Sequence, residues 1–183
     1  VCSSDLLQVS TTGTDSDFVV KLIDVYPNEL DEPAQARRKR GEDSDAPASQ
    51  LAGYQQLVRG EPFRGRYRRS PSAPVAFTPG KPDSLRFAMP DIHHTFRAGH
   101  RVMVQVQSSW FPLTDRNPQT FVPNIFFAKP EDYVKATQRI YHAPGTLSAI
   151  SLPVVPSNSM YCGLIETRAA SPRVTIRRTC APS

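Results

Sequence analysis

Most apolar residues in the middle of the chain recur at every second position, which is the spacing of a β-strand with one buried face. Residues 17–25 (DFVVKLIDV) differ, because they are largely apolar at both odd and even positions. Apolar side chains on both faces are typical of a strand that is buried between two layers. The pattern therefore predicts a central buried strand, followed by a turn at Pro27 and Asn28.

Two further segments alternate cleanly and predict strands with one buried face, residues 84–89 (SLRFAM) and 102–106 (VMVQV). The positions expected to face inward are Leu85, Phe87, Met89, Val102, Val104 and Val106. Gln105 is expected to face outward. A turn centred on Gly99 lies between the two segments.

Shorter apolar runs predict four more strands, at residues 54–58, 63–68, 135–141 and 149–155. Residues 60–62 (GEP) are expected to separate the first two of these strands. Only residues 131–137 have a weak helical pattern. Several short strands joined by Gly and Pro turns predict an all-β fold, a β-sandwich or jelly roll.

Three stretches lie outside this pattern and divide the chain into a domain and its flanks. Residues 29–51 combine an Arg-Arg-Lys-Arg run with acids and prolines, and we expect a mobile insertion. Residues 1–6 (VCSSDL) are what one frame of a common sequencing adapter encodes, so we interpret them as a non-native artefact. Residues 156–183 lack periodicity and are expected to be a disordered or non-native tail. The jelly-roll domain is thus expected to span residues 7–155.

The net charge of +5 would suit an acidic partner, but the basic residues are concentrated in two short runs, at residues 37–40 and 64–69. Acids next to the first run offset its charge, and the second run has no aromatic partner on its basic face, so we expect no nucleic-acid partner. On a strand, Arg64, Arg66 and Arg68 would share one face, and we expect them to pair with acids of a neighbouring domain. No apolar run approaches the roughly 18 residues of a membrane span, so no membrane partner is expected.

The motifs of common catalytic centres are missing from the sequence. No serine has the flanking glycines of a Gly-x-Ser-x-Gly elbow, and no phosphate-binding glycine loop is found. The spacing of Ser109, His100 and Asp115 does not support a triad. The three cysteines lack the short spacing of zinc ligands. The sequence alone does not decide whether Cys162 and Cys180 form a disulfide. We therefore expect no catalytic residue, no metal and no cofactor.

Five runs carry a resemblance to a known family: TDSDFVVKLIDVYP, FRGRYRRS, HTFRAGHRVMVQVQSSWFPLTDRNPQ, KATQRIYH and ISLPVV. Together they resemble the C-terminal domain of the CocE/NonD hydrolases, which Xaa-Pro dipeptidyl-peptidases share. Within that family, the runs most resemble those of α-amino-acid ester hydrolases and glutaryl-cephalosporin acylases. The resemblance covers most of residues 15–155 and implies a jelly-roll β-sandwich, often called galactose-binding-like. In that family the sandwich begins before residue 15, which implies that one or more strands are missing at this N-terminus.

The resemblance also implies a function. In that family the Ser, Asp and His of the triad lie in a separate α/β-hydrolase domain earlier in the chain, and none of them has a counterpart here. The segment is therefore expected to be a non-catalytic C-terminal domain of a serine hydrolase of the dipeptidyl-peptidase or acyl ester hydrolase type. Its expected partner is the α/β-hydrolase domain of the same chain, on which it would pack and whose substrate pocket it would help to shape.

Four residues are expected to make such interdomain or pocket-side contacts: Trp110, Phe111, Asp115 and Arg116. For the two aromatic residues, packing in the core is the competing interpretation and the one we prefer. The same two interpretations apply to Phe121, Phe126 and Phe127. Alternatively, Asp115 would cap its own turn, and Arg116 would bind a carboxylate or loop carbonyls with its planar donors.

A free-standing carbohydrate-binding jelly roll is the alternative function, because lectin-like domains share this architecture. Trp110, Tyr54 and Tyr67 would then be its stacking residues. Fold alone does not choose between the two functions, whereas an upstream Gly-x-Ser-x-Gly elbow would favour the hydrolase. The substrate, the oligomeric state and the cellular compartment lie beyond what the segment indicates.

Overall fold

The computed structural model describes residues 3–28, 51–152 and 175–177. Almost all of the expected mobile insertion, all three cysteines and most of the expected tail lie outside these residues. The chain divides into two compact units, one made of Val1–Val19, Glu61–Asp91 and Gln107–Ser183, the other of Val20–Gly60 and Ile92–Val106. Each unit is described by itself below.

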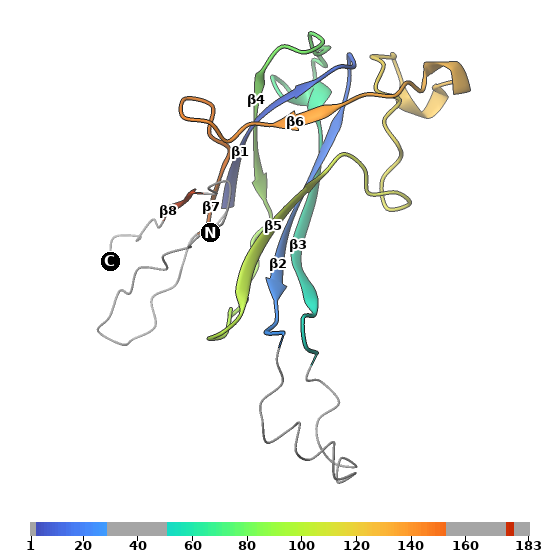
Figure 1. The fold of residues 1–183 in the computed structure, drawn as a ribbon. Coiled ribbons are helices and arrows are strands. Elements are labelled where there is room, and N and C mark those ends of the chain that lie inside the picture. Colours follow the sequence, from blue (N-terminus) through green and yellow to red (C-terminus); the bar gives the residue numbers. More distant parts are fainter. Residues whose placement is uncertain (1–2, 29–50, 153–174, 178–183) are drawn as a thin grey trace. The chain divides into compact units, whose positions relative to one another are not determined.

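The larger sheet lies in the first unit and is built around the N-terminal strand (Figure 1). Its strands are β1 (Ser3–Thr11), β4 (Asp83–Met89), β6 (Gln138–Ile140), β7 (Ala149–Ser151) and β8 (Thr175–Arg177). The strand order is β4-β1-β7-β8, and β6 also pairs with β1. All pairs are antiparallel except β7 with β8. Leu7 of β1 lies opposite Leu85 of β4, and both side chains are buried, which sets the inner face of the sheet.

The second sheet contains β2 (Asp17–Val25), β3 (Gln55–Arg64) and β5 (Arg101–Gln107), in the order β3-β2-β5. β2 is the central strand, and every residue in it is buried except Lys21, which is partly exposed. The predicted two-sided burial of residues 17–25 is therefore confirmed. The predicted phase of β4 is also confirmed, because Leu85 and Met89 are buried and Arg86 is exposed.

The predicted break at residues 60–62 is wrong. β3 runs without interruption through Gly60 and Pro62, and the chain leaves it at a 3-10 turn, Gly65–Tyr67. β3 is an edge strand of its sheet, where a proline can turn its missing N–H side away from the ladder. The expected second strand at residues 63–68 is therefore the end of β3 and this turn.

Within the first unit, one aromatic contact connects strands of the two sheets and a second connects β2 to a loop residue. The ring of Phe63 on β3 stacks on that of Phe87 on β4, with centroids 5.1 Å apart. Phe18 of β2 meets Phe77 edge to face at 6.4 Å, and both side chains are buried. These contacts agree with the predicted all-β, jelly-roll β-sandwich class, which is confirmed.

The described residues contain only short 3-10 helices, Gly65–Tyr67, Ile125–Phe127 and Pro130–Asp132. The weak helical pattern at residues 131–137 therefore corresponds to less than one turn of helix at its start. No helix in this part of the chain is long and apolar enough to cross a membrane.

Candidate functional site

The residues expected at an interdomain contact lie in a long loop that leaves β5, at residues 108–134. Trp110 is half-buried, whereas Phe111 is 57% exposed, so the preferred core packing is wrong for Phe111. Phe126 and Phe127 are 78% and 80% exposed and are also not core residues. Apolar rings held out of the core at one loop are unusual for a surface that only water covers.

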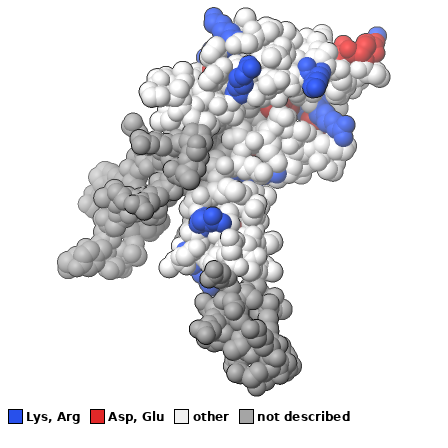
Figure 2. Space-filling view, viewed as in Figure 1, with Lys and Arg blue, Asp and Glu red and all other residues white. Residues whose placement is uncertain are grey.

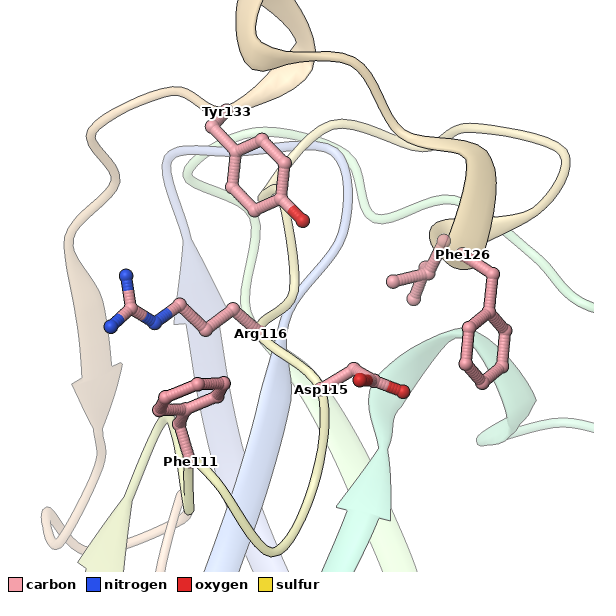
Figure 3. A pocket seen from close by; sticks show the side chains of 6 residues that line it. Phe111, Asp115, Arg116, Phe126 and Tyr133 are labelled. Atoms are coloured by element: carbon pink, nitrogen blue, oxygen red, sulfur yellow. The ribbon is translucent and has the colours of Figure 1, made fainter.

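Three of the four expected contact residues come together around a pocket of about 490 Å³. Its lining residues are Phe111, Asp115, Arg116, Ile125, Phe126 and Tyr133 (Figure 3). The guanidinium of Arg116 lies 4.6 Å from the centroid of the Phe111 ring, in a cation–π contact. The pocket thus combines apolar rings with one positive and one negative side chain.

The two charged groups of the pocket have few partners in the part of the chain that the structure describes. Within it, Asp115 makes no hydrogen bond or ion pair, and Arg116 makes only the contact with Phe111. The turn cap expected for Asp115 is therefore wrong. Both residues are exposed.

A buried carboxylate holds the loop at the residue that follows Arg116. Asn117 donates from Nδ2 to Oδ1 of Asp17 at 2.8 Å, and both residues are buried. Burial raises the pKa of Asp17 to about 6, although the hydrogen bond from Asn117 and the charge of Arg64 act in the opposite direction. The backbone N–H of Gln119 donates in turn to Oδ1 of Asn117 at 2.8 Å.

Backbone contacts fasten the next residues of the loop to the turn between β1 and β2. The carbonyl of Gln119 accepts from the N–H groups of Thr14 and Asp15, at 3.0 and 3.2 Å. A side chain on Gly13 would place its Cβ 2.4 Å from the same carbonyl oxygen, so this approach requires glycine. The N–H of Phe121 donates to Oγ1 of Thr14 at 2.8 Å.

A buried ion pair supports this turn from the other side. Oδ2 of Asp15 accepts from Nε and Nη2 of Arg66 at 2.9 and 2.6 Å, and the two side chains are 0% and 3% exposed. The guanidinium of Arg66 also lies 4.7 Å from the ring centroid of Phe121. Asp15 and Arg66 belong to two runs that carry the resemblance, TDSDF and FRGRYRR, and Asn117 belongs to a third, DRNP. Their residues meet in one buried polar cluster, which gives them a structural role.

The predicted arginine ladder toward a neighbouring domain is wrong for Arg66 and Arg68. Arg68 pairs with Asp83 of this chain at 2.6 Å, donates to three backbone carbonyls and lies over the ring of Phe77. Arg69 forms a second ion pair with Asp83. Burial alone would raise the pKa of Asp83, but the hydrogen bonds from Arg68 and from a backbone N–H lower it overall. On the face of the molecule seen in Figure 2, Lys and Arg side chains are scattered singly.

The second unit contains a cluster that sequence reasoning missed. Asp24 of β2 is 2% exposed, and its two oxygens lie 2.9 Å from Nε2 of His94 and from Nδ1 of His100. The ring of His100 also packs on Tyr26, with centroids 4.4 Å apart. The two histidines lie 70 and 76 positions after Asp24 in the sequence, so local spacing carried no signal for their contact with it. A carboxylate inside an apolar strand was the one available hint.

These histidines do not form a hydrolase triad with residues in the described ranges. His94 and His100 are hydrogen-bonded to Asp24, and neither is bonded to a serine hydroxyl. No group of three His, Cys, Asp or Glu side chains among the described residues could hold a metal ion. Tyr54 of the carbohydrate-binding alternative belongs to the second unit, whereas Tyr67 and Trp110 belong to the first.

Comparisons with known proteins agree on one family. Residues 6–151 match the model of the X-Pro dipeptidyl-peptidase C-terminal non-catalytic domain. The cocaine esterase of Rhodococcus sp. (strain MB1 Bresler) is 31% identical over 149 residues, which are 81% of this chain and 22% of the esterase.

Two solved structures give the same relation. An α-amino acid ester hydrolase is 52% identical, with a TM-score of 0.70, over 81% of this chain and 22% of that chain. An aminopeptidase from a marine sediment archaeon, Thaumarchaeota archaeon, is 47% identical, with a TM-score of 0.69 and the same coverage. The chain thus spans about a fifth of the length of the relatives that it matches. It belongs to the family of X-Pro dipeptidyl-peptidase C-terminal non-catalytic domains.

Proposed function

We propose that this domain is the inactive C-terminal module of a serine hydrolase that cleaves ester or amide bonds. In this proposal it packs on an α/β-hydrolase domain of the same chain and helps to shape that domain's substrate pocket. The observation that carries the proposal is the match to three hydrolases, of each of which this chain covers only 22%. In each of these relatives, the part that this chain does not cover is the larger part, and it is long enough to contain a catalytic domain with its triad.

The chemistry of the described residues supports an inactive module. A serine hydroxyl is a weak nucleophile until an adjacent base takes its proton, and a third group must orient that base. Asp24 orients two histidines here, but neither has a serine partner. The surface expected to meet the catalytic domain is the loop with Trp110, Phe111, Asp115 and Arg116.

The test is an activity assay on the purified 183-residue chain, after circular dichroism has shown β structure. We expect no hydrolysis of Xaa-Pro p-nitroanilides or p-nitrophenyl esters above the buffer rate. We also expect no labelling by a fluorophosphonate probe, whereas the full-length protein labels at one serine outside this domain.

Two results would contradict the proposal. The first is turnover by the chain that Ser108→Ala or Ser109→Ala abolishes. The second is a full-length protein that no fluorophosphonate labels and that carries no reactive serine, because a serine hydrolase depends on one.

A further inference from the structure

The pocket in the loop at residues 108–134 presents three aromatic rings to solvent. Phe111, Phe126 and Tyr133 are 57%, 78% and 46% exposed, and all three line the same hollow. Rings of this kind give large contact area for little loss of conformational freedom, which is why they dominate the centres of protein interfaces. Figure 3 shows Phe111 beside Arg116, and Phe126 on the side of the loop toward which Asp115 points, so each charged group has an aromatic ring near it.

The charges beside the rings are arranged for a partner with charges of its own. Arg116 is held against the face of Phe111, which leaves the edge of its guanidinium available for a carboxylate. Asp115 projects on the other side of the loop in Figure 3 and has no polar partner in the part of the chain that the structure describes. A surface that supplies one acid and one base at these two positions would pair both groups.

The backbone that carries the pocket is held in place from within the first unit. Asn117 is bonded to the buried Asp17, and the carbonyl of Gln119 accepts two N–H groups. At the opposite rim, the side chain of Asn124 accepts from the N–H of Phe126 at 3.0 Å. A surface that is already ordered loses little entropy on binding, which favours its use as a docking site.

We propose that this pocket is the anchor site for an apolar side chain of the α/β-hydrolase domain, flanked by an acid that meets Arg116 and a base that meets Asp115. This inference rests on the proposed function and names the part of the surface that makes the contact. The hollow of about 490 Å³ is open to solvent, so a side chain of another domain can enter it. The relatives are several times longer than this chain, so a larger body is available to cover the rings.

The experiment is hydroxyl-radical footprinting of the full-length protein, with each ring's reactivity corrected for its residue type. If nothing covers the pocket, Phe126 should be among the most reactive phenylalanines, as its 78% exposure requires. We expect instead that Phe111, Phe126 and Tyr133 react as slowly as rings that are fully buried, such as Phe18.

Two matched pairs of variants in the full-length protein test whether this pocket is the reason that the three rings are protected from hydroxyl radicals. Phe126→Ser removes a lining ring, whereas Phe127→Ser removes an equally exposed neighbour that does not line the pocket. We expect Phe126→Ser to raise the undocked population, read as the reactivity of Tyr133, roughly 30-fold, which corresponds to about 2 kcal/mol. Phe127→Ser should leave it nearly unchanged. Arg116→Glu should raise it too, while Arg139→Glu at an exposed site on β6 should not.

The outcomes separate this inference from the proposed function. Protection of the three rings that is lost in Phe126→Ser and kept in Phe127→Ser supports the anchor site. Rings that stay reactive while another surface of the domain is protected overturn the anchor site but leave the domain packed on its partner. If the reactivity of every ring in the full-length protein follows its exposure in this structure, no surface of the domain is covered, and both the anchor site and the proposed function are overturned.

Discussion

Removal of Arg66 should destabilise the domain severely, because its carboxylate partner has no access to water. The side chain of Asp15 is 0% exposed, and two of the three hydrogen bonds that its carboxylate accepts come from Arg66, the third from the N–H of Ser16. Arg66→Met therefore leaves a buried charge with one donor. Breaking a buried ion pair on one side costs about 3–5 kcal/mol, and at about 2–4 °C per kcal/mol the melting temperature should fall by roughly 6–20 °C.

The same reasoning predicts strong coupling between the two partners. Asp15→Asn alone leaves a buried guanidinium without its counter-charge, whereas Arg66→Met with Asp15→Asn leaves neither charge. The double variant should therefore lose clearly less free energy of unfolding than the sum of the single variants, with a coupling of roughly 1–3 kcal/mol. Urea denaturation of the four proteins, followed by circular dichroism, measures all the terms.

Arg69→Met is the control, because it removes an arginine from an ion pair near the surface. Arg69 is 55% exposed, and its partner Asp83 keeps Arg68. The expected cost is below about 1 kcal/mol. If Arg66→Met costs no more than Arg69→Met, or if the losses at Asp15 and Arg66 are additive, the buried pair does not stabilise this turn as argued.

Two further predictions concern single side chains. The pKa of Asp17 is about 6 in the folded chain against its ordinary value of 3.8, so the folded state keeps its proton to higher pH and stability should fall as pH rises from about 4 to about 6. Asp17→Asn, which can still accept from Asn117, should remove this dependence and gain up to about 3 kcal/mol at pH 8 in urea titrations; an unchanged pH profile would refute the raised pKa. Val104→Asp should lower thermal stability far more than Gln105→Asp, because Val104 is half-buried and Gln105 is exposed on β5. Equal losses in differential scanning fluorimetry would show that the phase of this strand is wrong.

The sequence predicts well those strands whose buried residues follow a regular apolar pattern within the strand itself. β2 is apolar on both faces and β4 alternates cleanly, so period alone identifies their buried residues. The sequence analysis does not predict β1, because it interprets the first six residues as an artefact and only Leu7 and Val9 show the apolar alternation in the rest of the strand. That interpretation of residues 1–6 stays a prediction, which the upstream nucleotide sequence would test.

The parts of the site that sequence reasoning missed depend on contacts between distant residues. Arg66 and Arg68 share a strand face only if the strand continues, and the 3-10 turn at Gly65 sends them to different acids. A Cβ on Gly65 would lie 2.6 Å from both the ring of Phe77 and the carbonyl of Ser16, a constraint that no local pattern reveals. Asp24 and its histidines are joined in the same long-range way.

The loop at residues 108–134 is held to the rest of the first unit at its base, whereas the residues at its tip are exposed. Residues at the tip can therefore be exchanged with little effect on the fold. Asn117 and Gln119 hold the base through the buried cluster around Asp17, whereas the pocket residues Phe111 and Phe126 contribute little to the core. In the proposed docking, the exposed residues of the loop can be substituted to fit a different partner domain while its base is left unchanged. A chimera that joins this domain to such a partner would then need matched loop residues and no new fold.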